Sequence, residues 1–121
     1  MNNKIAAKKS KKITLDEKCR LNFPPAIAER EKLVDQQRVY FVKSYRNCVI
    51  VDFHKIPDGV SQVFTGKITV SIIKGAVRIR FRHRVTVPAG IRDRCTFLRQ
   101  RKVKIVDCGK YIELWPLPEK K

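Results

Sequence analysis

The strongest constraint on the fold is that the sequence aligns with itself, without a gap, when it is shifted by 64 positions. The shift places Ile13–Arg30 over Val77–Arg94 and continues to match apolar positions with apolar positions further along the chain. Four of the matched pairs are Arg20 with Arg84, Pro24 with Pro88, Ile27 with Ile91 and Arg30 with Arg94. Self-similarity over this length indicates one structural unit that occurs twice.

Each copy has the same predicted order of short elements. Two strands separated by a charged turn come first, at about Ile13–Leu15 and Arg20–Phe23 in copy one and at about Thr69–Ile79 and Arg84–Val87 in copy two. Pro24 and Pro88 then open short helices, because proline is tolerated at the first helical position.

A hairpin closes each copy. The predicted strands are Val39–Lys43 with Cys48–Phe53, and Val103–Val106 with Tyr111–Trp115. Gly109 supplies the positive φ that the second of these tight turns needs. In the helix of copy two, Ile91, Cys95 and Leu98 fall at i, i+4 and i+7, which predicts one buried face.

Neither copy is long enough to bury a core of its own. We therefore expect the two copies to pack face to face with interleaved hairpins, as a pseudo-dimer within one chain. The predicted fold class is mainly β with short helices (α+β). The predicted organisation is a basic flexible arm at 1–12, a first repeat at 13–55, a linker with a short helix and the start of a strand at 56–76, and a second repeat at 77–119.

The chain is strongly basic, with a formal net charge of +17 and an isoelectric point near 10.2. Such a charge favours an acidic partner, either a nucleic acid or an anionic membrane surface. No apolar run approaches the roughly 20 residues that cross a bilayer, and the absence of a signal peptide predicts a cytoplasmic location with reduced thiols. The four cysteines are widely spaced and form no C-x-x-C pair, so neither a zinc site nor another cofactor is predicted.

Arginine alternates with other residues in Val77–Pro88. Successive side chains of a strand point to opposite faces, so one face would carry Arg78, Arg80, Arg82 and Arg84 and the other Val77, Ile79, Phe81 and His83. Stacked arginines repel one another unless an anion lies across them, and nucleic acid is the obvious polyanion. The alternative is a solvated edge strand whose charges discourage aggregation.

The two copies resemble the MraZ family, whose repeats belong to the SpoVT/AbrB swapped-hairpin superfamily. The family pattern is Asp-x-x/Lys-Gly-Arg, a strand, a proline and a short helix. Asp16–Pro24 is similar to it in copy one and Arg80–Pro88 in copy two, and Tyr111–Pro116 looks like the family's closing strand. The resemblance covers about Ile13 to Glu119.

This resemblance implies a duplicated swapped-hairpin, AbrB-like β-barrel. It also implies a cytoplasmic, nucleoid-associated transcriptional regulator that binds promoter repeats in double-stranded DNA through arginine-bearing loops. Members of the family assemble into rings of subunits, so a homo-oligomer is expected.

Both motif glycines are replaced, by Cys19 and His83. Glycine at such a turn usually serves a positive φ, which cysteine and histidine tolerate less well. Copy two also has Arg80 in place of the motif acid, so Arg84 lacks the partner that Asp16 can offer in copy one. The second arginine turn is therefore expected to contribute more DNA-binding energy than the first.

Seven residues are the predicted DNA contacts: Lys18, Arg20, Arg78, Arg80, Arg82, His83 and Arg84. The sequence contains no readable Ser/His/Asp set, paired catalytic carboxylates or glycine-rich phosphate loop, so neither an enzyme nor a small-molecule substrate is predicted. The alternative hypothesis is a non-catalytic module on the same fold that binds RNA or nonspecific DNA, or an antitoxin-like interaction partner.

Overall fold

The structure is a computed structural model that describes residues 9–44, 47–55 and 62–117. The strands in chain order are β1 (Lys9–Thr14), β2 (Arg20–Asn22), β3 (Arg38–Lys43), β4 (Val49–Asp52), β5 (Phe64–Lys74), β6 (Ile79–Thr86), β7 (Lys102–Asp107) and β8 (Tyr111–Pro116). The helices are α1 (Pro25–Arg30), α2 (Ala89–Arg94) and the 3-10 helix η1 (Thr96–Gln100). The prediction of a mainly β chain with short helices is confirmed.

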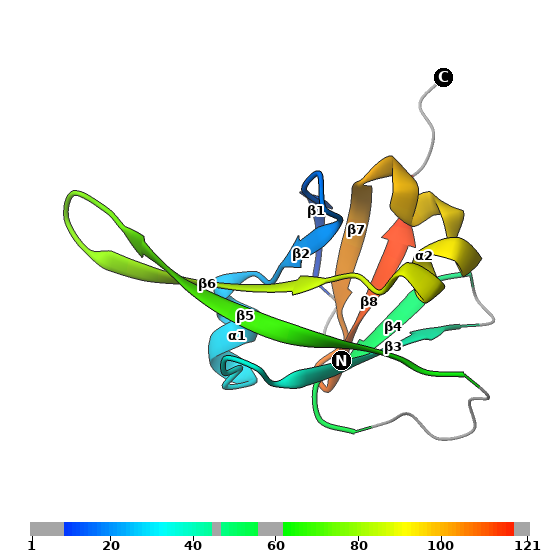
Figure 1. Cartoon of the computed structure of the whole chain (residues 1–121), viewed down its shortest axis with the longest axis horizontal. Helices are drawn as coiled ribbons and strands as arrows, with labels where there is room; N and C mark the ends of the chain where they lie inside the picture. The colour runs from blue at the N-terminus through cyan, green and yellow to red at the C-terminus, as the bar shows by residue number, and fades with distance from the viewer. Residues whose placement is uncertain (1–8, 45–46, 56–61, 118–121) are drawn as a thin grey trace, which may run out of the picture.

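All eight strands belong to one antiparallel sheet, in the order β1-β7-β8-β4-β3-β5-β6-β2. The turn between β1 and β2 joins the two ends of this order, where the N–H of Asp16 donates to the carbonyl oxygen of Arg20 at 3.4 Å. The sheet therefore forms a nearly closed barrel (Figure 1). Strands from the two halves of the chain pair with each other, as β1 with β7, β3 with β5, β4 with β8 and β2 with β6.

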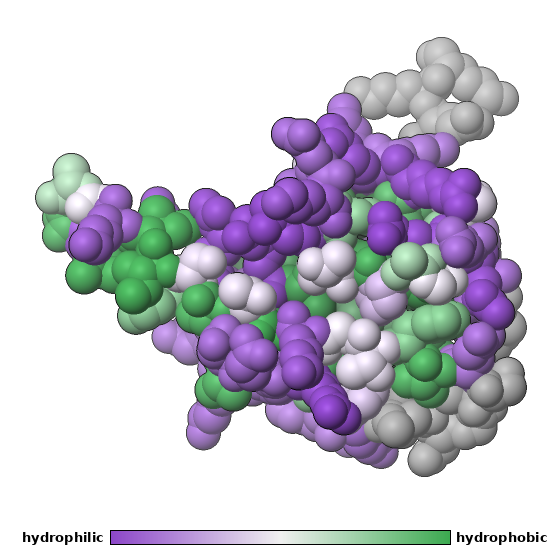
Figure 2. All heavy atoms as spheres, in the orientation of Figure 1, coloured by the Kyte–Doolittle hydropathy of each residue, from purple (hydrophilic) through white to green (hydrophobic). Residues whose placement is uncertain are grey.

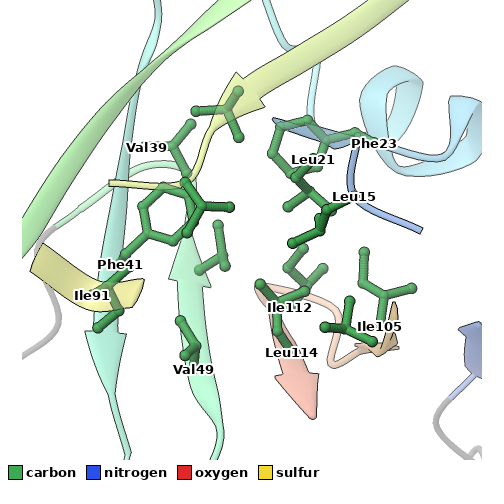
Figure 3. Packing of buried hydrophobic residues seen from close by; sticks show 14 of the residues in the cluster. Leu15, Leu21, Phe23, Val39, Phe41, Val49, Ile91, Ile105, Ile112 and Leu114 are labelled. Carbon is green, nitrogen blue, oxygen red and sulfur yellow. The ribbon is translucent and has the colours of Figure 1, made fainter. Parts of the chain in front are cut away.

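Side chains from both halves of the chain fill the interior of the barrel. Phe41 from β3 and Leu114 from β8 are fully buried, and Figure 3 shows both within the same cluster. Ile91, Cys95 and Leu98, predicted to share one buried face, are all buried, although α2 ends before Cys95 and Leu98 lies in η1. Each large apolar side chain buried in this way stabilises the fold by about 1.5–3 kcal/mol. The two halves of the chain therefore share one hydrophobic core.

Both helices that were expected after prolines are confirmed. Pro24 is the N-cap residue of α1, where Pro25 follows as the first helical residue, and Pro88 is the N-cap residue of α2. The hairpins that follow them are present as β3–β4 and β7–β8. Gly109 has the expected positive φ, of 90°, in the turn of the second hairpin.

The second copy departs from the predicted strand–turn–strand pattern. β6 runs without a break through Arg80–Arg84, so this segment lies in a strand and the predicted turn there is wrong. His83 accordingly pairs with Val70 across the ladder and has no positive φ. The turn lies at 75–78 instead. The alternation of side chains continues through the motif in copy two, and a strand that keeps this period keeps its apolar row on one face.

The beginning of the chain also differs from the prediction. Residues 9–12, expected to end a flexible basic arm, form part of β1 and pair with β7. Residues 1–8, residues 56–61 of the linker, where the short helix is expected to begin, and residues 118–121 lie outside the described residues.

β5 and β6 form a two-stranded arm that projects from the barrel (Figure 1). At its root, Ile68 and Val85 face each other in the core with sixteen residues between them in the sequence. The turn between β1 and β2 is flanked in the same way by the buried Leu15 and Leu21, with only five residues between them. The two connections are therefore of very unequal length, and only the β5–β6 connection leaves the barrel (Figure 1). We call residues 69–84 the arm.

The β1–β2 turn contains a strained residue. Cys19 has a φ of 58°, which costs a residue with a side chain about 1–2 kcal/mol. We expect the free energy of unfolding of Cys19→Gly to be about 1 kcal/mol higher than that of Cys19→Ala, because only glycine adopts this φ freely. Urea unfolding of the two variants measures the difference.

The matched control compares alanine with glycine at position 26, because Ala26 is exposed in α1. There Ala26→Gly should lower the free energy of unfolding by about 0.5–1 kcal/mol, because glycine destabilises a helix. If Cys19→Gly were no more stable than Cys19→Ala, backbone strain would not govern this turn.

Candidate nucleic-acid interface

One face of the arm carries the arginines of β6. Residues that lie directly opposite each other in an antiparallel ladder share a face of the sheet. The pairs on this face are Thr69 with Arg84, Ser71 with Arg82 and Ile73 with Arg80. At the tip, the N–H of Gly75 donates to the carbonyl oxygen of Arg78 at 3.0 Å, which continues the row. The predicted alternation is confirmed, and we call Arg78, Arg80, Arg82 and Arg84 with their facing residues the arginine face.

No acidic residue of the arm balances this charge. The segment 64–86 contains six Lys and Arg residues and no Asp or Glu. Arg78, Arg80 and Arg82 are exposed, and none of them forms an ion pair with any residue in the described ranges. Side chains on one face of a strand repeat about every 7 Å. The charges therefore repel one another, and an anion along the row would relieve that repulsion.

β2 adds the second motif arginine to this surface at the root of the arm. Arg20 lies opposite Thr86, and Asn22 lies opposite Arg84, in the β2–β6 ladder. Arg20, Thr69, Arg84 and Thr86 line a cleft of about 110 Å³. Nε of Arg84 is buried and has no hydrogen-bond partner among the described residues. Guanidinium and hydroxyl groups are donors to phosphate oxygens, so the cleft suits one phosphate group.

Asp16 holds Arg20 beside this cleft. Its Oδ2 accepts from Nε of Arg20 at 2.6 Å and lies 3.9 Å from Nη1 of Arg84. Its Oδ1 accepts from the backbone N–H groups of Lys18 and Arg20. Desolvation raises the pKa of this carboxyl, but the hydrogen bonds from Arg20 and Lys18 outweigh it and the pKa lies below its ordinary value. Asp16 is therefore ionised at neutral pH and offsets part of the charge at the cleft.

Most of the predicted DNA contacts come together on this surface. Arg78, Arg80, Arg82 and Arg84 form the row, Arg20 joins it at the root, and Lys18 is exposed in the adjoining β1–β2 turn. His83 does not belong to the arginine face, since it shares the other face of the arm with Val70. The alternation in the sequence already places His83 on that side.

Sequence reasoning misses several polar residues of the same surface. Thr69 and Ser71 face the arginines from β5, Thr86 faces Arg20 from β6, and the exposed Lys67 lies two residues before Thr69. The signal that could have found those in β5 is the alternation of polar and apolar residues in Thr65–Ile72, which is typical of a half-buried strand.

A second cavity, of about 230 Å³, contains mixed charges. It is lined by Glu31, Asp52, His54, Lys55, Gly109 and Lys110. Glu31 is engaged within the protein, because Oε1 lies 2.7 Å from Nε2 of His54 and Oε2 accepts from Arg30. No cluster of His, Cys, Asp and Glu that could hold a metal ion occurs in the part of the chain that the structure describes. None of the described helices is long and apolar enough to span a bilayer.

Comparisons with family models, with curated proteins and with solved structures found no match to this chain. The MraZ assignment therefore stays a prediction from the motif residues.

Proposed function

We propose that this chain binds double-stranded DNA through the arginine face and acts as a non-catalytic transcriptional regulator. The observation that carries the proposal is a row of four arginines on one face of a projecting arm, in a segment without a single Asp or Glu. Neutralisation of DNA phosphates by Lys and Arg releases counterions and supplies much of the affinity of such proteins.

The shape of the arm supports the same function. The major groove admits a two-stranded β-ribbon, and arginine can bind guanine there through two hydrogen bonds. In this arrangement Arg78, Arg80 and Arg82 enter the groove or neutralise phosphates at its edges. The cleft between Arg20 and Arg84 binds a backbone phosphate and fixes the position of the arm on the duplex.

We also propose that the barrel is a duplicated swapped-hairpin fold of the SpoVT/AbrB type. In support of this, the first strand of each half pairs with the closing hairpin of the other half, as β1 with β7 and β5 with β3. The remaining contacts between the halves, β2 with β6 and β4 with β8, join equivalent strands. A pseudo-two-fold relation between two copies requires this reciprocal pairing. In a homo-oligomer several arms would bind repeated promoter elements together.

The salt dependence of binding tests the electrostatic part of the proposal. Fluorescence anisotropy of a labelled duplex measures the association constant over a range of NaCl concentrations. Four phosphate contacts predict a slope of log K against log [NaCl] of about −3.6. A slope near zero would show that the arginines do not meet phosphates.

Competition tests whether the protein is a specific regulator. Duplex fragments selected from the host genome compete with random duplex DNA and with RNA of equal length. Preferential displacement by the selected fragments supports the regulator. Equal displacement by all three would favour the alternative, a module that binds nucleic acids without sequence preference.

Replacing Asp16 should strengthen DNA binding. Asp16→Asn keeps an acceptor oxygen for the backbone N–H groups of Lys18 and Arg20, but it removes the carboxylate that binds Arg20 and repels phosphate. We expect roughly three- to tenfold tighter binding at low salt, which corresponds to about 1 kcal/mol. Anisotropy titrations against the unchanged protein measure it.

The control for Asp16→Asn is Asp93→Asn. It removes the same charge and also releases an arginine, because Asp93 is paired with Arg99 at 2.9 Å, but neither residue belongs to the arginine face. A similar gain for both variants would mean that only the net charge matters.

A further inference from the structure

The face of the arm opposite the arginines is largely apolar and exposed. The ladder places Ile72 opposite Phe81, and on the same face Ile79 lies opposite the exposed Lys74. Ile72 is 61% exposed, Ile79 60% and Phe81 58%, and Val77 at the tip is 95% exposed. Figure 2 shows hydrophobic surface over much of the projecting arm. We call Ile72, Val77, Ile79 and Phe81 the apolar face.

This face continues the apolar row of the barrel core. Ile68 and Val85, on the same side of the ladder at the root, are buried, and Val70 is partly buried against the core. Exposure begins at the next pair, Ile72 with Phe81. Lys74 lies beside this row, but a lysine can pack its aliphatic stem along an apolar surface and keep its charge in water. A contiguous apolar patch of this kind therefore indicates that another surface covers it.

The barrel itself does not reach the outer arm. Among the described residues, the outermost hydrogen bonds between arm and barrel are those of the Val70 N–H to Asp35 and of the Phe23 N–H to the carbonyl oxygen of His83. Further out along the arm, the backbones of Ile72 and Phe81 form hydrogen bonds only within the β5–β6 ladder, among the described residues.

We propose that the apolar face is a homodimer interface, covered by the same face of a second copy of this chain. A two-fold interface uses one patch twice, so the patch must complement itself, and a row of aliphatic and aromatic side chains can do so. The arginines lie on the other side of the ladder in each arm. Two arms packed by their apolar faces therefore direct their arginine faces outward, away from each other.

The area approaches what such a pair needs. With the exposed fractions given above, the four side chains contribute roughly 400–500 Å² per chain, which is at the size where exposed apolar patches mark interaction sites. When fully covered, two such patches bury roughly 800–1,000 Å² together, which approaches the lower limit for a specific interface. The dimer does not depend on DNA binding, and it can be tested with nucleic acid removed.

Sedimentation of the full chain, free of nucleic acid, tests the interface. In NaCl high enough to screen the charge of +17, the mass should rise with concentration from 14.1 kDa to twice that value. Replacing Ile72 and Phe81 together by serine should raise the dimer dissociation constant at least a hundredfold. The matched control replaces Ile73 and Arg80, the adjacent pair on the arginine face, by serine and should leave the dimer intact.

A second measurement needs no variant. In the unchanged protein, the methyl resonances of Ile72 should shift with concentration, and those of Ile73 should not. A chain that stays monomeric up to several hundred micromolar, or a dimer that survives the change of Ile72 and Phe81, would overturn the proposal. If the chain were monomeric, the apolar face would have to be covered by something other than a second copy.

Discussion

Replacing Arg78, Arg80 and Arg82 together by serine is expected to weaken binding of duplex DNA about a thousandfold at low salt. A hydrogen bond to a charged group contributes about 1.5 kcal/mol or more, and three of them correspond to about three powers of ten in affinity. The slope of log K against log [NaCl] should also become less steep by about three, because three phosphate contacts are lost. Anisotropy titrations over a range of salt measure both quantities.

This triple variant should fold normally, because all three side chains are exposed and form no ion pair with a described residue. Its control removes three positive charges elsewhere, at Lys55, Lys102 and Lys110, which are exposed outside β2, β5 and β6. The control should lose far less affinity and should keep most of the salt dependence. If both variants lost affinity equally, net charge and not the arginine face would determine binding.

The period of the sequence predicts the two faces of the arm correctly. Polar and apolar residues alternate along most of β6, and successive side chains of a strand lie on opposite faces. The polar and the apolar residues must therefore lie on different faces. The short helices after Pro24 and Pro88 and the two closing hairpins also follow from local signals, because proline at a helix start and glycine at a turn act within a few residues.

The length of the arm does not follow from those local signals. Aligning the two copies without a gap puts a turn at Arg80–Arg84, on the pattern of the turn that ends at Arg20. In the structure β5 and β6 instead pair along the whole segment, where Ile68 and Ile72 face the apolar Val85 and Phe81 of β6. Long-range pairing of this kind overrides a local motif.

The position of Asp16 is another result of long-range pairing. Sequence reasoning assigns Asp16 to Arg20 alone, yet the pairing of β2 with β6 brings Arg84 within 3.9 Å of the same carboxylate. The contact with Arg20 is much shorter, at 2.6 Å. This difference supports the prediction that Arg84 contributes more to DNA binding than Arg20, because the stronger ion pair must be weakened before Arg20 can bind phosphate.

Shortening the arm should separate folding from binding. In this variant Ile72–Phe81 is replaced by Asn-Gly, so that Ser71 and Arg82, which face each other in the ladder, are joined by a two-residue turn. Asn-Gly is the preferred sequence for such a turn. The removed side chains are mostly exposed, and substitutions at exposed positions change stability little. We therefore expect the melting temperature to stay within about 5 °C of that of the full chain.

Binding should respond in the opposite way. The shortened chain keeps Arg20, Arg82 and Arg84 at the root but loses Arg78 and Arg80, and its ribbon no longer reaches into a groove. We expect its affinity for duplex DNA to fall at least a hundredfold, as measured by the same titrations. A stable barrel that still bound DNA normally would place the binding surface elsewhere. A chain that failed to fold would show that the outer arm stabilises the barrel, which its exposed side chains do not suggest.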